Sequence, residues 1–286
     1  MAIFTNQATL TYRNNVVNSN IVMGEILETL TVTKQAILPT YEAGGNIVYV
    51  VNLTNSGDTA LNGLILTDDL GAYTVGSVSI TPLSYVAGSL NYFIDGVLAA
   101  SPTVTSTDPL VATGISLPAG AVGTLVYQAV VNQFAPLEQG GEITNVATFT
   151  GGSLAEPVSD SETVTVNNAP RLDITKAITP VTVEPNGQIT YTFTILNYGN
   201  TATLVGDNVA VSDVFDPVLN AVTVTYNGAP WTAGTEYNYN SVTGEFSTVP
   251  GVIEVPAATY TQDPTTGAWS IAPGQAVITV TGNVAG

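Results

Sequence analysis

The chain of 286 residues has only two lysines, Lys34 and Lys176, and each ends a short alternating phrase, Leu-Thr-Val-Thr-Lys and Leu-Asp-Ile-Thr-Lys. On a β-strand each lysine would share a face with the two apolar residues before it, so the pattern predicts that both amines point into a core. Lysine is almost never fully buried unless it is paired. We therefore expect each lysine to have a specific partner nearby.

Two asparagines and two aspartates occur at matching places around these lysines. Asn145 lies in the apolar row of the phrase Ile-Thr-Asn-Val-Ala-Thr-Phe-Thr, and Asn6 lies in the related phrase Phe-Thr-Asn-Gln-Ala-Thr-Leu-Thr. Asp68 follows Leu-Ile-Leu-Thr and Asp213 follows Val-Ala-Val-Ser, and alternation puts each aspartate on the apolar face of its strand. The pattern predicts two buried sets, each of a lysine, an asparagine and an aspartate.

Burial suggests a reaction between these side chains. An apolar site favours a neutral lysine amine, which can attack the carboxamide of asparagine while a protonated aspartate polarises the carbonyl and helps ammonia to leave. We predict an isopeptide bond between Lys34 and Asn145 assisted by Asp68. A second bond would join Lys176 of one subunit to Asn6 of the next, assisted by Asp213. The competing interpretation is a buried salt bridge in each set, with no covalent step.

Composition excludes several other functions. The chain has no cysteine and no histidine, which removes disulfides, Ser-His-Asp and Cys-His catalysis and the usual zinc sites. A net charge of −18 argues against nucleic acid and anionic membrane surfaces as partners. We predict no cofactor and no metal, since the acidic segment 207–216 lacks the ligand spacing of a calcium loop. We also predict no enzyme, because a cross-link that consumes its own residues does not turn over.

An internal repeat organises the chain. The first copy has Glu42, Tyr49, Asn55 and Gly57 where the second has Glu184, Tyr191, Asn197 and Gly199. Both copies alternate Val, Ile and Leu with Thr and contain turn signals such as Asp95-Gly96, a pattern typical of an all-β Greek-key sandwich. We predict a donor strand and connector over 1–28, a complete sandwich over 29–168, and a second sandwich over 169–286 that lacks its last strand.

The segment 1–28, which we call the leader, contains a match to the strand that the second repeat is predicted to lack. Its apolar row of Phe4, Asn6, Ala8 and Leu10 alternates with polar residues, as the last strand of the first repeat does. We expect the leader of one subunit to complete the second repeat of another by donor-strand complementation, which propagates as a fibre. Two other arrangements are open at this stage: a leader folded back into its own second repeat, and a disordered tail.

The repeats also resemble a known family. Thr-Lys in the first strand, Asn-Ser-Gly or Asn-Tyr-Gly after the second, a later Thr-Asp or Ser-Asp and a final Thr-Asn-x-Ala-Thr look like the conserved immunoglobulin-like repeat domains of bacterial surface proteins. The resemblance implies two tandem immunoglobulin-like sandwiches. Related pilins and adhesins form Lys-Asn isopeptide bonds assisted by Asp or Glu, which supports those roles for Lys34, Asn145 and Asp68, and by symmetry for Lys176, Asn6 and Asp213.

These observations predict the structural subunit of an extracellular fibre on a cell or spore surface. Its partner would be itself, as a head-to-tail homopolymer, together with any tip or anchor proteins. Residues 1–7 lack the features of an ordinary cleaved signal peptide, and no segment is long enough to insert into a membrane, which favours a self-assembling pilus or spore appendage over a sortase-assembled pilin. The alternative is a monomeric cell-surface adhesin or stalk whose domains bind a ligand.

Overall fold

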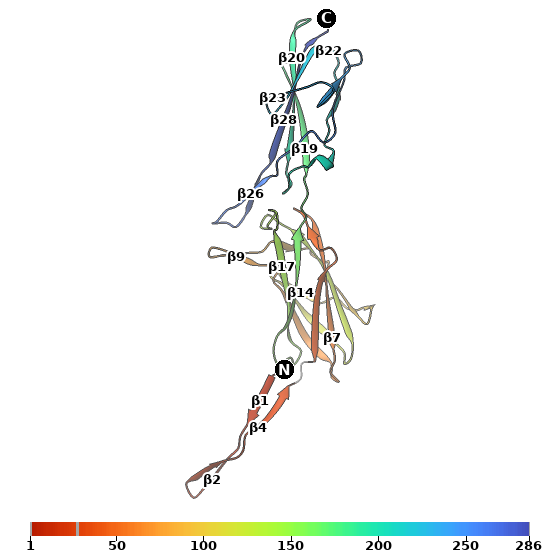
Figure 1. Cartoon of the computed structure of the whole chain (residues 1–286). Coiled ribbons are helices and arrows are strands. Elements are labelled where there is room, and N and C mark those ends of the chain that lie inside the picture. Colours follow the sequence, from red (N-terminus) through yellow and green to blue (C-terminus); the bar gives the residue numbers. More distant parts are fainter. Residues whose placement is uncertain (1, 27–28, 286) are drawn as a thin grey trace. The chain divides into compact units, whose positions relative to one another are not determined.

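The computed structural model describes residues 2–26 and 29–285 and shows an all-β chain with one short 3-10 turn, η1 (Val205–Asp207). The chain divides into two compact units, each of which contains one sandwich of two antiparallel sheets (Figure 1). The first unit holds residues 1–136, 142–165 and 264–267, and the second holds residues 137–141, 166–263 and 268–286. The predicted all-β fold with tandem immunoglobulin-like sandwiches is confirmed.

The leader forms a hairpin rather than a single extended strand. Its antiparallel pairs are β1 (Ala2–Asn6) with β4 (Val22–Ile26), and β2 (Thr9–Tyr12) with β3 (Asn15–Asn18) (Figure 1). The turn between the arms is Arg13-Asn14, whose φ angles of 43° and 62° suit a two-residue hairpin turn. The sequence analysis predicted the first arm and missed the second, because this turn lacks the glycine that usually marks such hairpins.

The first sandwich packs two six-stranded sheets against each other. The strands of one sheet are β5 (Leu30–Ala36), β7 (Asn46–Asn55), β11 (Leu83–Tyr85), β12 (Asn91–Ile94), β13 (Val97–Leu98) and β16 (Val122–Val131). The strands of the other are β6 (Thr40–Tyr41), β8 (Leu61–Asp68), β14 (Thr103–Thr107), β15 (Leu110–Leu117), β17 (Glu142–Gly151) and β18 (Val158–Val166). A separate ribbon pairs β9 (Tyr73–Val75) with β10 (Val78–Ile80).

Strand order and alternation in the first sandwich explain its core. The sheets run β13-β12-β16-β7-β5, with β11 also on β16, and β14-β15-β8-β17-β18-β6. In β7 the residues Ile47, Tyr49, Val51 and Leu53 are buried, and the residues between them are less buried. This period of two puts one face of each sheet against the other sheet. The inward residues of the two sheets therefore meet in the core.

The second sandwich has one large sheet and one small sheet. The large sheet has the order β19 (Leu172–Thr179), β20 (Gln188–Asn197), β28 (Gly274–Val284), β22 (Leu219–Tyr226) and β23 (Ala229–Trp231). The small sheet has the order β21 (Ser212–Val214), β25 (Glu245–Thr248) and β24 (Tyr237–Tyr239). A ribbon pairs β26 (Thr259–Gln262) with β27 (Trp269–Ala272). The core of the second sandwich includes Ile189, Phe193, Phe215, Phe246 and Ile278.

The two sandwiches differ at the edge next to their first strand. In the described residues, the small sheet of the second sandwich has no counterpart of β17 and β18. Leu30 and Val32 on β5 are 3% and 7% exposed, whereas their repeat counterparts Leu172 and Ile174 on β19 are 40% and 49% exposed. The second sandwich therefore exposes an apolar face of β19, whereas the equivalent face of β5 is buried within the first sandwich.

A buried asparagine ties the loops together in each sandwich. The side-chain amide of Asn55 donates to the carbonyl oxygens of Thr59 and Pro118, both at 2.9 Å, and its Oδ1 accepts from the Gly57 amide at 3.1 Å. Asn197 repeats this pattern with Thr201, Pro256 and Gly199. The shared Asn-Ser-Gly and Asn-Tyr-Gly phrases are thus explained by loop structure.

Replacing this asparagine should destabilise the first sandwich. Asn55→Ala removes the side-chain amide and leaves buried backbone carbonyls without a donor, so we expect the free energy of unfolding to fall by about 3 kcal/mol. Denaturant unfolding of the full chain measures the loss. The control is Asn62→Ala at an exposed position of β8, which should change stability by less than about 0.5 kcal/mol. Equal effects of the two substitutions would contradict the assigned role.

Candidate functional site

The first sandwich brings Lys34 and Asp68 into direct contact and places Asn145 in the same core. Lys34 lies on β5 in one sheet, and Asp68 and Asn145 lie on β8 and β17 in the other. The three residues are 2%, 0% and 0% exposed. The Lys34 Nζ atom lies 2.6 Å from Asp68 Oδ2. The pair therefore joins the two sheets across the core.

Tyr127 connects this ion pair to Asn145. The Tyr127 hydroxyl donates to Asp68 Oδ2 at 2.5 Å and accepts from Asn145 Nδ2 at 3.2 Å. The other carboxylate oxygen, Asp68 Oδ1, accepts from the Leu70 amide at 3.1 Å. Asn145 Oδ1 is buried and has no hydrogen-bond partner in the described part of the chain. A buried acceptor without a donor is costly, and the hydroxyl of Tyr49, whose ring lies beside Lys34, is likewise buried without a partner among the described residues.

Burial also changes the acid–base properties of the site. It lowers the pKa of the Lys34 ammonium, and the adjacent Asp68 carboxylate opposes this shift without cancelling it. Burial raises the pKa of the Tyr127 phenol well above its ordinary value, and the charge of Asp68 raises it further. Lys34 Nζ lies 4.8 Å from the centre of the Tyr49 ring. The Lys34 ammonium thus loses its proton more easily than an ammonium in water, and the phenol stays protonated as a donor.

Two other acidic residues near the site have structural roles. Asp69 Oδ1 accepts from the backbone amides of Gly71 and Val146, both at 2.9 Å, which ties the end of β8 to β17. Asp160 on β18 accepts from the backbone amide of Lys34 at 2.7 Å. This bond satisfies a donor on the free edge of β5 and closes the side of the sandwich.

The second sandwich holds the equivalent ion pair in a more open setting. Lys176 Nζ on β19 forms an ion pair with Asp213 Oδ2 on β21, and the two side chains are 40% and 20% exposed. The Lys176 amine lies 4.5 Å from the centre of the Tyr191 ring and 5.4 Å from that of Phe215. A surface pocket beside Asp213 is lined by Ser212, Val214, Glu245, Phe246 and Ser247. The Lys176–Asp213 pair is thus partly exposed to solvent, whereas the Lys34–Asp68 pair is enclosed.

The remaining predicted site residues lie in the leader. Asn6 pairs with Val22 inside the hairpin, where Phe4 and Leu10 are 53% and 62% exposed. Ala8 is exposed as well. The apolar row that the sequence analysis assigned to a donor strand is therefore on the surface of the leader.

The sequence analysis missed Tyr127. Tyr127 lies opposite Tyr49 on the neighbouring strand, and Val280 lies opposite the repeat counterpart Tyr191. The first repeat thus has a phenol where the second has an aliphatic side chain. Tyr127 carries the only polar side chain among the inward residues of β16, and that was the available signal in the sequence.

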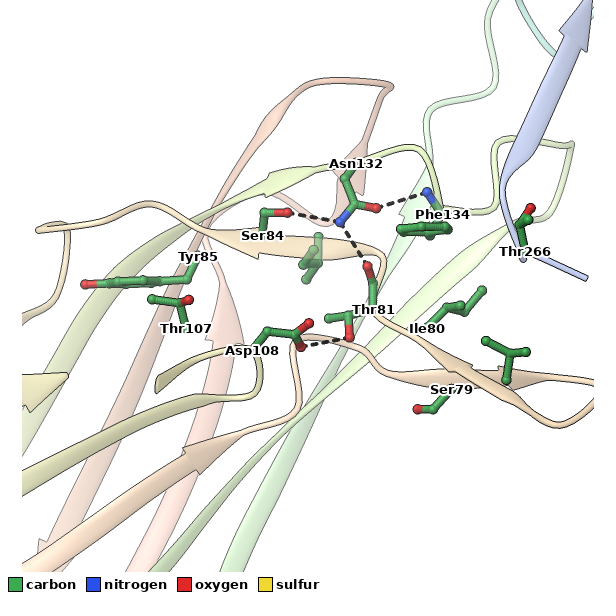
Figure 2. A pocket seen from close by; sticks show the side chains of 12 residues that line it. Ser79, Ile80, Thr81, Ser84, Tyr85, Thr107, Asp108, Asn132, Phe134 and Thr266 are labelled. Atoms are coloured by element: carbon green, nitrogen blue, oxygen red, sulfur yellow. Dashed lines mark hydrogen bonds between the residues drawn. The ribbon is translucent and has the colours of Figure 1, made fainter. Parts of the chain in front are cut away.

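A second pocket lies near β10 and β11, and several of the polar residues that line it bond to one another (Figure 2). Asn132 Nδ2 donates to the Thr81 carbonyl at 2.9 Å and to Ser84 Oγ at 3.0 Å, and Thr81 Oγ1 donates to Asp108 Oδ1 at 3.0 Å. These polar groups satisfy one another and hold the loops in place.

In the described residues, no cluster of acidic side chains could hold a metal ion. No described helix could cross a membrane.

Comparisons with known proteins find structural neighbours only. No protein-family model and no curated protein matches the sequence. The match with the major pilin BcpA of Bacillus cereus covers 95% of this chain and 73% of the pilin, with 12% identity and a TM-score of 0.36. The pilus backbone protein RrgB of Streptococcus pneumoniae matches 86% of this chain, which spans 55% of that protein, with 12% identity and a TM-score of 0.36. The match with a C-terminal fragment of the major pilin of Streptococcus agalactiae covers 86% of this chain and 91% of the fragment, with 12% identity and a TM-score of 0.34. No function is carried to this chain at such identities.

The phenol of Tyr127 should contribute measurably to stability. Tyr127→Phe removes a donor from a buried carboxylate and an acceptor from Asn145, so we expect the free energy of unfolding to fall by about 2 kcal/mol. Denaturant unfolding of the full chain measures the change. Tyr12→Phe in the exposed leader is the control and should be neutral. A neutral Tyr127→Phe would show that the phenol does not support the pair.

Proposed function

We propose that the chain is the structural subunit of a self-assembling extracellular fibre, a pilus or spore appendage. Subunits join head to tail by donor-strand complementation, and Lys-Asn isopeptide bonds lock both the first sandwich and the joint between subunits. The partner of the chain is therefore another copy of itself, with tip or anchor proteins at the ends of the fibre. The resemblance to bacterial surface repeat domains supports the extracellular location.

The observation that carries this proposal is the pair of complementary apolar surfaces. The face of β19 is exposed at Leu172 and Ile174, and the leader exposes Phe4 and Leu10. The leader matches β17 of the first sandwich in sequence, and on β17 the residues Ile143, Ala147 and Phe149 are 2% exposed or less. Insertion of the leader of a second copy would remove both surfaces from water, which stabilises the complex by roughly 25 cal/mol for each Å² of apolar area buried.

The same insertion would complete the second reactive site. In the first sandwich the apolar row that contains Ile143 and Ala147 also contains Asn145, which lies beside the Lys34–Asp68 pair. The leader has Asn6 at the matching place in its own row. Inserted in the register of β17, it would bring Asn6 to the accessible Lys176–Asp213 pair. This supports an intermolecular bond between Lys176 and Asn6.

The proposed reaction balances without a cofactor. Proton transfer from Lys34 to Asp68 leaves a neutral amine and a neutral acid and keeps the net charge of the site unchanged. The Lys34 nitrogen then bonds to the carboxamide carbon of Asn145, the carbon–nitrogen bond of the amide breaks, and ammonia leaves with the proton supplied by the amine. The lowered pKa of the Lys34 ammonium favours the first step, and the unpartnered Asn145 Oδ1 can accept a hydrogen bond from the acid.

The internal bond should be visible as a loss of mass. Formation of one isopeptide bond releases one ammonia, so the denatured monomer should weigh about 17 Da less than its sequence requires. Intact-protein mass spectrometry measures this difference. Lys34→Ala and Asn145→Ala should each restore the full mass of their own sequences. A native chain at its unmodified mass would leave only the salt bridge.

The joint between subunits should depend on Asn6. In Asn6→Ala the leader keeps its apolar row, so polymers should still form but should dissociate to monomers on boiling in detergent. Gln7→Ala, on the opposite face of the leader, is the matched control and should keep the ladder of boiling-resistant bands. Mass spectrometry of the native ladder should find a peptide that joins Asn6 to Lys176. A boiling-resistant Asn6→Ala polymer would exclude Asn6 as the joint, and a native chain that stays monomeric would favour the adhesin.

A further inference from the structure

In the first sandwich, the edge that has no counterpart among the described strands of the second sandwich consists of two strands. β17 does not complete its sheet alone, because β18 pairs with it along almost its whole length, from Glu142 opposite Thr165 to Phe149 opposite Val158. On β18, Val164 is fully buried and Val166 is 5% exposed. The hairpin of β17 and β18 therefore forms this side of the core as a unit.

β18 also satisfies the edge of the opposite sheet. The Asp160 carboxylate accepts the backbone amide of Lys34 at 2.7 Å, on the edge of β5 that faces away from β7. Without β18, that edge would keep its free amide groups, which favours pairing with other chains. In the described residues of the second sandwich, β19 pairs with β20 alone. One inserted strand would complete the small sheet and leave this side open.

The leader has the organisation that such a site requires. Antiparallel partners share a face of a hairpin, so the apolar row of β1 and β2 continues onto the other arm through Phe4 opposite Gly24, Asn6 opposite Val22 and Leu10 opposite Val17. The Phe4 ring covers Gly24, where an added Cβ would lie 2.3 Å from the ring. Each paired segment thus presents apolar residues of both arms on one face, and the register shifts by one residue between the two segments, from Asn6 opposite Val22 to Thr9 opposite Asn18.

We infer that a subunit donates its whole leader hairpin to the second sandwich of another copy. β1 and β2 take the place of β17, and β3 and β4 take the place of β18. The inference rests on the proposed function and specifies the element that is exchanged. The leader therefore inserts without breaking the pairing of β1 with β4 or of β2 with β3.

The energetic reason is the number of backbone groups that stay paired. Insertion of the first arm alone would separate the hairpin and leave the amide and carbonyl groups of β3 and β4 without their partners. It would also leave Val17 and Val22, which are 50% and 56% exposed in the leader, outside the joint. Insertion of the intact hairpin keeps these bonds and covers both valines.

A reversible cross-link within the hairpin tests the inference directly. The chain has no cysteine, so Thr9→Cys with Asn18→Cys introduces the only pair. Thr9 Oγ1 and Asn18 Oδ1 lie 3.1 Å apart, and both residues alternate with those of the apolar face, so a disulfide here would lie on the opposite face. The oxidised variant should polymerise as well as the native chain. Assembly that stops on oxidation and returns on reduction would show that the arms must separate, and would overturn the inference.

Two neighbouring valines on the second arm give an independent test. Val17 shares the apolar face with Leu10, whereas Val16 pairs with Thr11 on the opposite face. Both are exposed in the leader, so Val17→Asp and Val16→Asp should both fold. We expect Val17→Asp to abolish polymerisation, because its charge would be buried in the joint, and Val16→Asp to retain it. Polymerisation of both variants would overturn the inference, while a native chain that forms no polymer would overturn the proposed function itself.

Discussion

The burial of a lysine and an aspartate between two sheets is the constraint on which the first sandwich depends. Lys34 and Asp68 come from opposite sheets and are fully enclosed, so their desolvation must be offset by close contact and by partners for the remaining polar atoms. The Tyr127 phenol and the Leu70 amide supply those partners for the carboxylate. The Asn145 carbonyl oxygen remains without one, and its carbon is the atom that the Lys34 nitrogen would attack in the proposed cross-link.

The second sandwich has the same pair in a different environment. Lys176 and Asp213 contact each other, but the strands that enclose their counterparts are missing from the described part of this sandwich. An incomplete apolar edge and an accessible amine are liabilities in a solitary domain, because both invite contact with other chains. In a subunit that receives part of another copy, they become the binding site. The contrast between an enclosed and an accessible site thus links the fold to the proposed assembly.

Reasoning from the sequence went furthest where the structural rule was local. Alternation predicted that Lys34, Asp68 and Asn145 face the core, and the structure places all three there. It did not identify Tyr127, because the contact of its phenol with Asp68 depends on how two sheets pack. It also missed the second arm of the leader, whose tight turn at Arg13 and Asn14 has positive φ angles at residues other than glycine.

The sequence by itself determined the all-β class, the repeat and the inward row of each strand, because a side-chain period of two belongs to the strand and needs no partner. Only the tertiary structure decided which inward side chains meet. Strand register and the packing of one sheet on another bring residues distant in the chain together, as Lys34 and Asp160 show. Those long-range contacts place a phenol between Asp68 and Asn145, and they leave the corresponding edge of the second sandwich open.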